Sequence, residues 1–246
     1  MRLELLFEIE KTEIPKDNKS IWISFLKKTL KQASEGQFYE KYFSGTRMKD
    51  YTFSVVLPSP QFLDEKIILG GNQIKFLFSA DDKNRTGLIF FQAFLLAKQK
   101  RFPLPEGNAM TLKKIRQVGE KLITCEKVMF RTIVGGGLVV RAHNKETNKD
   151  KFLTFMDEGF DKQLSEILKI QAENAGFSGK IGEKVEFQPI QCKKVLVKQY
   201  GIFVDATIGI FTLKGDPDFL QYLYQAGMGS KHSMGYGMLD VIAQKK

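Results

Sequence analysis

The fold of this chain is constrained most by the order of the segments in which apolar side chains recur at strand or helix spacing. Residues 2–10 alternate polar and apolar side chains, with Leu5 and Phe7 on one face, which is typical of a β-strand. In residues 20–34 the apolar side chains recur at helical spacing instead. Further along, the pattern predicts strands at 51–57, 66–69, 73–79 and 110–118 and a helix at 81–100. The turn residues 70–72 predict a hairpin between the strands on either side of them.

The second half of the chain repeats this order of elements. Asp216 and Pro217 open its last helix well, because Asp caps a helix and Pro suits the first turn. The expected elements are strands at 128–133 and 138–142, a helix at 160–175, strands at 184–189, 193–200 and 202–213, and a strand at 234–243. Strand, helix, strand, strand, helix, strand is the ferredoxin-like unit. The sequence therefore predicts an α+β fold of two tandem ferredoxin-like (RRM-like) βαββαβ modules, residues 1–118 and residues 119–246.

Length and charge are consistent with two basic modules. The chain has 246 residues, and single domains commonly run to ~100–150 residues. Lys and Arg outnumber Asp and Glu by 38 to 28, which gives a net charge of +10. A surface of this charge attracts polyanions, and RNA, DNA and anionic membranes all qualify. No apolar run approaches the ~20 residues of a membrane-spanning helix, so we expect no membrane partner.

The cysteines bear on metal binding and on the compartment. Cys125 and Cys192 lie far apart, and neither has Cys or His at the spacing of zinc ligands. We therefore expect no metal site and no cofactor. Two isolated cysteines fit a reducing compartment, so we expect a cytoplasmic protein.

A glycine-rich segment, residues 226–238, carries the sharpest signal for binding. Glycine lets the backbone take positive φ and approach a ligand closely, and backbone N–H groups in such a loop can hold phosphate oxygens. The spacing fits neither a P-loop nor a dinucleotide-binding motif. The structural alternative is a helix cap followed by a tight turn. The residues expected to contact a polyanion here are Gly227, Gly229, Ser230, Lys231, His232, Ser233, Gly235 and Gly237.

This segment resembles the signature of the CRISPR-associated precursor-crRNA endoribonucleases of the RAMP superfamily. Their pattern is Gly-x-Gly, a short stretch with a basic residue, then Gly-aromatic-Gly, and residues 227–237 match it. The segment Tyr51-Thr52-Phe53-Ser54 is similar to a strand start of the same family, aromatic-Thr-aromatic-Ser. The paired ferredoxin-like modules of the family extend the resemblance over nearly the whole chain.

The resemblance implies a reaction as well as a fold. Members of this family bind the transcript of CRISPR repeats, the precursor crRNA, and cut it once per repeat without a metal. The 2′-hydroxyl beside the scissile phosphate attacks in line and leaves a 2′,3′-cyclic phosphate and a 5′-hydroxyl. This chemistry needs a base for the 2′-hydroxyl, an acid for the leaving oxygen and cations for the charge on the phosphorane.

The chain departs from the family where a catalytic histidine is common, just after the first helix. Residues 35–50 contain no histidine, and the only histidines of the chain are His143 and His232. Three alternatives stay open. Other residues replace the histidine in catalysis, or the histidine was substituted artificially, or the protein binds RNA without cutting it.

The first alternative names four candidate catalytic residues. Tyr39 or Tyr42 would orient the reactants or exchange a proton, Lys49 would neutralise the phosphorane, and Lys28 on the first helix could face the same site. Arg47 lies in the same window. Tyrosine and lysine, with ordinary pKa values of ~10 and ~10.4, are poor bases unless those values fall. The ordinary alternative is that the tyrosines belong to the core and the lysines are solvated.

Two lysines of the second module are further candidates for RNA contacts. Lys194 and Lys198 lie four residues apart in one strand and so point to the same face. Contacts of this type to phosphates give affinity but no choice of sequence. The leading prediction is a metal-independent endoribonuclease that acts on CRISPR repeat RNA. The alternative is an inactive subunit that holds crRNA beside other subunits of a CRISPR effector complex, and the chain itself is expected to be a monomer or a homodimer.

Overall fold

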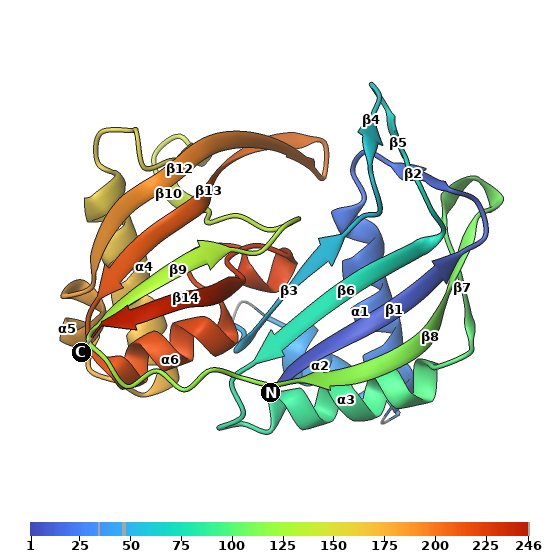
Figure 1. The fold of residues 1–246 in the computed structure, drawn as a ribbon, viewed down its shortest axis with the longest axis horizontal. Coiled ribbons are helices and arrows are strands. Elements are labelled where there is room, and N and C mark those ends of the chain that lie inside the picture. Colours follow the sequence, from blue (N-terminus) through green and yellow to red (C-terminus); the bar gives the residue numbers. More distant parts are fainter. Residues whose placement is uncertain (34, 46–47, 246) are drawn as a thin grey trace.

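Figure 1 shows two sheets side by side in the computed structural model of the chain, which describes residues 1–33, 35–45 and 48–245. One sheet ends its last strand at Val118, and the other begins its first strand at Lys127. We call the two halves the N-terminal and C-terminal modules. The exact boundary between residues 118 and 119 stays a prediction. No helix of the described residues is long and apolar enough to cross a membrane.

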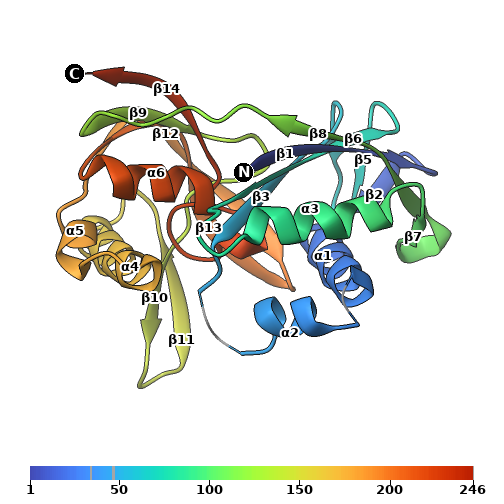
Figure 2. The same cartoon turned by 90° about the horizontal axis from the view of Figure 1, so that it is seen from below.

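The N-terminal module is built around five antiparallel strands in the order β3-β6-β1-β8-β7. Its helices α1 and α3 lie on one face of this sheet (Figure 2). Its elements are β1 (Arg2–Ile9), β2 (Glu13–Pro15), α1 (Lys19–Ala33), α2 (Gln37–Phe43), β3 (Tyr51–Val56), β4 (Gln61–Phe62), β5 (Lys66–Ile68), β6 (Gln73–Ala80), α3 (Thr86–Ala97), β7 (Arg101–Pro103), η1 (Pro105–Gly107) and β8 (Ala109–Val118).

The C-terminal module is built around four antiparallel strands in the order β12-β13-β9-β14. The helices α4 and α6 lie on the same side of their sheet as α1 and α3 do in the other module (Figure 2). Its elements are β9 (Lys127–Thr132), β10 (Val140–Asn144), β11 (Lys149–Leu153), α4 (Phe160–Ala175), α5 (Gly179–Glu183), β12 (Glu186–Gln199), β13 (Ile202–Lys214), α6 (Pro217–Ala226), η2 (His232–Met234) and β14 (Leu239–Lys245).

Both sheets have the strand order of a ferredoxin-like unit. In each, the first strand of the unit lies between the third and the fourth, and the second strand lies beside the third. A helix joins the first strand to the second and another joins the third to the fourth. The predicted fold class, α+β with two tandem ferredoxin-like modules, is confirmed.

The hairpin predicted at residues 70–72 is wrong. The strand before this turn, β5, pairs with β2 and β4 in a small separate sheet, whereas β6 pairs with β1 and β3. Because both edges of β6 are occupied, the turn carries the chain from one sheet into another. Glycines at a turn mark a reversal of direction, but they do not identify the strand's partners.

Edge-to-face aromatic contacts fill the N-terminal core, as the helical stripe of 20–34 predicted. Phe7 of β1 contacts Trp22 and Phe25 of α1 at ring-centroid distances of 5.3 and 5.0 Å. Both rings of α1 are at most 2% exposed. Such pairs add to the free energy gained by burying the apolar area.

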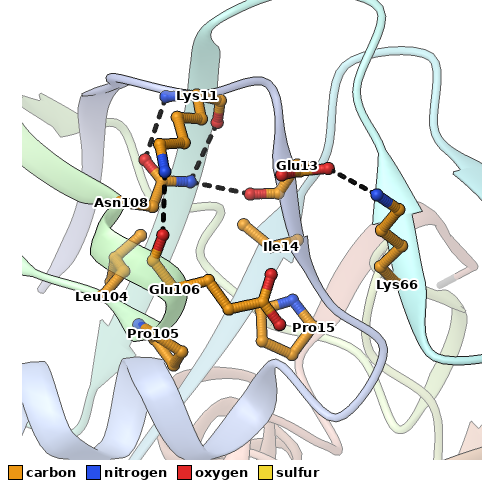
Figure 3. A pocket seen from close by; sticks show the side chains of 9 residues that line it. All are labelled: Lys11, Glu13, Ile14, Pro15, Lys66, Leu104, Pro105, Glu106 and Asn108. Carbon is orange, nitrogen blue, oxygen red and sulfur yellow. Dashed lines mark hydrogen bonds and ion pairs between the residues drawn. The ribbon is translucent and has the colours of Figure 1, made fainter.

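A small pocket at the edge of the N-terminal module is organised by Asn108 (Figure 3). The Asn108 amide nitrogen donates to Lys11 O at 3.0 Å and to Glu13 O at 2.8 Å, and its oxygen accepts from Lys11 N at 2.9 Å. The pocket holds about 10 Å³, roughly the space of one water molecule. Asn108 therefore links the segment around β2 to the segment before β8, and the pocket itself is too small for a ligand.

The strands β12 and β13 extend well beyond the other two strands of the C-terminal sheet (Figure 1). β13 pairs with β9 only from Ile210 onward, so residues 191–209 form a two-stranded arm, bridged once to Leu138 through Thr207. The tip of the arm meets the N-terminal module, where Gly201 N donates to Asp17 Oδ2 at 3.1 Å and Lys198 Nζ lies 3.5 Å from Glu65 Oε2. The arm thus links the two modules, and it also packs on the segment before β14, where Gln199 Nε2 donates to Met234 O at 3.4 Å.

Candidate functional site

The glycine-rich loop, residues 227–237, lies between the two modules and joins α6 to β14. Its glycine N–H groups donate to protein oxygens: Gly227 to Leu223 O at 3.0 Å, Gly229 to Gln171 Oε1 at 2.8 Å, Gly235 to His232 O at 3.2 Å and Gly237 to Gly137 O at 2.7 Å. These donors are therefore engaged within the protein, and RNA contacts by the four glycines stay predictions. Whether other atoms of the loop contact RNA stays a prediction.

Two of the glycines show how closely the loop is packed. Gly235 and Gly237 have φ of 89° and 66°, in the left-handed region that favours glycine. A Cβ on Gly237 would lie 2.1 Å from Met228 O, and one on Gly235 would lie 2.7 Å from the Phe53 ring. Phe53 belongs to β3, so the loop is pressed directly against the N-terminal module.

The strand start Tyr51-Thr52-Phe53-Ser54 supplies the other side of this contact. Its aromatic side chains belong to the N-terminal core, whereas its hydroxyls reach the C-terminal module. Thr52 Oγ1 donates to Tyr236 O at 2.6 Å, and Ser54 Oγ donates to Val134 O at 2.7 Å. We call residues 51–54, Val134 and the glycine-rich loop the joint.

His232 lies inside the joint. Its side chain is 4% exposed, and Nδ1 lies 3.0 Å from Tyr51 O. Burial lowers the pKa of His232, so the ring is neutral near pH 7. The ring faces the backbone of β3 instead of solvent, and a contact of His232 with RNA stays a prediction.

The polar residues on the outer edge of the loop are half-buried. Ser230 Oγ accepts from Arg141 N at 3.3 Å. The Lys231 amine lies 5.6 Å from the centroid of the Phe152 ring, and burial lowers the pKa of Lys231. RNA contacts by Ser230, Lys231 and Ser233 stay predictions.

A lysine that the sequence did not single out lies beside the joint. Lys19, the first residue of α1, is 7% exposed. Its Nζ donates to Gly235 O at 2.6 Å and to Gly135 O at 3.2 Å, and it lies 4.2 Å from the centroid of the Tyr236 ring. Burial alone lowers the pKa of Lys19 to about 7.

A groove of about 810 Å³ runs between the modules and has Lys19 in its lining. Its walls come from the start of α1 and the end of β3 on one side and from the arm on the other. The basic residues of its lining are Lys16, Lys19, Lys193 and Lys198. Apolar side chains of the lining are also open to solvent, with Phe62 64% and Leu196 60% exposed.

The structure separates the two lysines that were predicted to act together on β12. Lys198 lies in the lining of the groove, whereas Lys194 does not. Lys194 Nζ instead forms an ion pair of 2.8 Å with Asp205 of the neighbouring strand. Lys193 takes its place in the groove, because both faces of the arm contribute to the wall.

A second pocket, of about 390 Å³, brings together two of the predicted catalytic residues, Tyr42 and Lys49. Burial lowers the pKa of Lys49. Tyr42 is 3% exposed, its hydroxyl lies 2.8 Å from Thr86 Oγ1, and burial raises its pKa far above the usual range. The Tyr42 hydroxyl therefore stays protonated and cannot act as a base near neutral pH.

The other predicted catalytic residues do not line this pocket. Tyr39 stacks on Phe43 with ring centroids 5.6 Å apart. The Lys28 amine lies 5.1 Å from the centroid of the Phe102 ring. Arg47 lies outside the described residues. The roles of Tyr39, Tyr42, Lys49 and Lys28 stay predictions.

The sequence reasoning did not single out two residues that contact the joint, Lys19 and Gln171. Lys19 precedes the apolar stripe of its helix, so no periodicity marks it. Gln171 left a signal, since it falls on the apolar stripe of α4 and is fully buried there. Gln171 Nε2 donates to Gly227 O at 3.0 Å, and its oxygen accepts from Gly229 N. Among the residues that the structure describes, no group of three His, Cys, Asp or Glu is placed to hold a metal ion.

Comparison with known protein families shows to which of them the chain belongs. Residues 117–241, about half the chain, match the family model described as CRISPR associated protein Cas6, C-terminal. The chain belongs to the Cas6 family. The matched region includes both the glycine-rich loop and the arm. A comparison with curated proteins found no match.

Solved structures of Cas6 proteins have the same fold over the full length of the chain. The product of a Cas6-related gene from Pyrococcus furiosus is 19% identical and has a TM-score of 0.82, covering 100% of this chain and 99% of its own. A RAMP protein described as binding different RNA substrates is 18% identical, also with a TM-score of 0.82, covering 99% and 100%. A third, described as CRISPR associated protein Cas6, is 19% identical with a TM-score of 0.73 and covers 99% of each chain.

Proposed function

We propose that this chain binds the RNA transcript of CRISPR repeats in the groove between its modules. The observation that carries the proposal is the groove itself, about 810 Å³ in volume and lined by lysines from both modules. A chain of phosphates is the ligand that these lysines and a net charge of +10 attract. Membership of the Cas6 family and the likeness to a RAMP protein that binds RNA support the same conclusion.

The apolar part of the groove suits unpaired bases. Phe62 on one wall and Leu196 on the other expose most of their side chains. Single-stranded RNA is recognised by bases that unstack and rest on aromatic or apolar side chains. Contacts from Lys193 and Lys198 to phosphates would add affinity that falls with salt.

We further propose that the protein cuts this RNA once within each repeat, without a metal. The 2′-oxygen attacks phosphorus and the bond to the 5′-oxygen breaks, which leaves a 2′,3′-cyclic phosphate. The proton of the 2′-hydroxyl goes to a base, and the 5′-oxygen takes a proton from an acid. Lys49 would stabilise the phosphorane and, with its lowered pKa, would donate that proton. The protonated Tyr42 hydroxyl would orient the phosphate.

A subunit that holds crRNA without cutting it is the second candidate. Two observations favour it: residues 35–50 contain no histidine, and the Tyr42 hydroxyl is buried against Thr86. Such a subunit would use the same groove. The two candidates therefore differ in the reaction and share the binding site.

One experiment separates these functions. A labelled repeat RNA is incubated with the protein in EDTA, beside a copy with a 2′-deoxy sugar at the cut, and binding is followed across a salt series. One cut that survives EDTA and disappears with the deoxy sugar would establish the ribonuclease, and Lys49→Ala should then slow it by ~100-fold or more. Tight binding without a cut would establish the holding subunit. No binding even at low salt would refute the RNA assignment.

A further inference from the structure

Lys19 is a buried cation without a counter-ion. Its amine lies among neutral groups: the Gly135 and Gly235 carbonyls and the face of the Tyr236 ring. Burial is the whole cause of its altered acidity, and no charge of the described residues offsets that burial. A buried charge without a partner is costly, so a protein that keeps one commonly uses it at a functional site.

The position of the Lys19 amine indicates that it lacks an anionic partner. An ammonium group has three N–H donors, and the hydrogen bonds of the described residues use two of those on Lys19. Lys19 lines the groove, as do Gly135 and Gly136 beside it. The amine is also at the first residue of α1, where the positive end of the helix dipole adds to its attraction for an anion. An anion in the groove would complete this environment.

We propose that Lys19 is an anion-binding residue at the floor of the groove, where one RNA phosphate supplies its counter-ion and binding takes up a proton. This inference rests on the proposed function, because the anion is a phosphate of the RNA bound in the groove. Arginine or an exposed lysine would bind the same phosphate without any proton uptake. The structure therefore assigns a dependence of RNA binding on pH to this buried position.

The surroundings of Lys19 determine the pH range. In the free protein the pKa of Lys19 is about 7, so the amine is partly neutral at physiological pH. A bound phosphate favours the ammonium and raises this pKa. Burial raises the pKa of Tyr236, which therefore stays neutral in the same range. The other ionisable groups along the groove or close to Tyr236 are Lys16, Asp17, Cys192, Lys193 and Lys198.

The test is the affinity for repeat RNA between about pH 6 and about pH 9, at constant salt, for the wild type and three variants. In the wild type the affinity should fall as pH rises, by at most about tenfold per pH unit, the limit for one linked proton. Lys19→Arg keeps its charge throughout and should remove most of this slope. At the low end of the pH range Lys19→Met should bind the RNA about tenfold more weakly than the wild type, and its affinity should no longer fall as pH rises.

Lys193→Met is the matched control, because it removes an exposed lysine of the same groove. It should weaken binding by a similar factor at every pH and leave the slope unchanged. If Lys19→Arg kept the slope of the wild type, the inference would be overturned. If no variant and no wild-type protein bound the RNA at any pH, the proposed function itself would fall.

A second measurement needs no variant, in case substitutions at the joint unfold the protein. Calorimetric titration of the wild type with repeat RNA is repeated near pH 7.5 in two buffers of different ionisation enthalpy. The difference between the two heats gives the number of protons taken up, which should be a substantial fraction of ~1 per RNA. Equal heats in both buffers, with binding present, would overturn the inference.

Discussion

At the scale of single residues, the joint is set by how closely backbone atoms approach one another. Gly237 lies in the left-handed region, with its α-carbon against the Met228 carbonyl. A glycine at positive φ tolerates alanine at a modest cost where space is open. Where a carbonyl fills that space, the backbone itself must move. The same backbone conformation can therefore carry very different costs at two positions.

Gly237→Ala should lower the free energy of unfolding by at least ~3 kcal/mol, from backbone strain together with the clash against Met228 O. Gly159→Ala is the matched control, because Gly159 has φ of 82° and a Cβ added to it would meet nothing within 4 Å. It should cost only ~1 kcal/mol. Urea unfolding of both variants measures the difference, and equal losses would show that packing at the joint is not the cause.

Lys19 also makes the stability of the fold depend on pH. The pKa of its amine is 10.5 in the unfolded chain and about 7 in the folded one, so between these values the unfolded chain holds more protons. The free energy of unfolding contributed by this group therefore rises with pH across that range. Lys19→Met should lack this rise, which unfolding in urea at about pH 7 and about pH 9.5 would reveal. Parallel pH profiles for the two proteins would contradict the burial of a charge here.

At the scale of elements, α6 delivers the chain into the glycine-rich loop, and its start is fixed by a cap. Asp216 accepts hydrogen bonds from Asp218 N and Phe219 N, both at 3.0 Å. The sequence predicted this cap and the Pro217 that follows it. The cap aligns α6 so that its last residue, Ala226, is fully buried where the loop begins.

Asp216→Ala should lower the free energy of unfolding by ~1 kcal/mol, the usual cost of removing a capping side chain. Ser178→Ala is the control, because Ser178 stands at the start of α5 without a side-chain capping bond. It should change stability by only a few tenths of a kcal/mol. Chemical denaturation of the two variants is sufficient, and an equal loss at Ser178 would show that the capping bond is not the source.

At the scale of the whole molecule, the joint couples two separate cores. Thr52 and Ser54 each donate across it to a carbonyl of the other module, and both side chains are fully buried. A buried donor that loses its acceptor costs more free energy than the hydrogen bond itself contributes. Separation of the modules would leave both donors without acceptors, so we expect the two modules to unfold together.

Unfolding followed by fluorescence and by circular dichroism should give one coincident transition. The single tryptophan, Trp22, reports on the N-terminal core, whereas circular dichroism reports on both modules. Thr52→Val should lower the free energy of unfolding by ~1–2 kcal/mol and so shift the common midpoint to lower urea. Two separate transitions in the wild type would show that the joint does not couple the modules.

The sequence predicted the fold better than it predicted the site, for a physical reason. Periodicity reports which face of an element is buried, and it placed both ferredoxin-like units and the stripe of α1 correctly. It does not report which module a buried residue faces, so the roles of Thr52 and Ser54 in the joint were not predicted. The glycine motif likewise predicted close backbone approach, but the approaching groups are protein carbonyls and a phenylalanine ring.

The arm has a further consequence for any RNA that lies in the groove. Gln199 Nε2 donates to Met234 O at 3.4 Å, and Val204 and Ala206 pack with Tyr236, so the arm is attached to the glycine-rich loop as well as to Asp17 and Glu65. The arm also forms one wall of the groove. An RNA that pushed this wall outward would therefore strain the joint, and the cohesion of the two modules would limit how far the groove can widen.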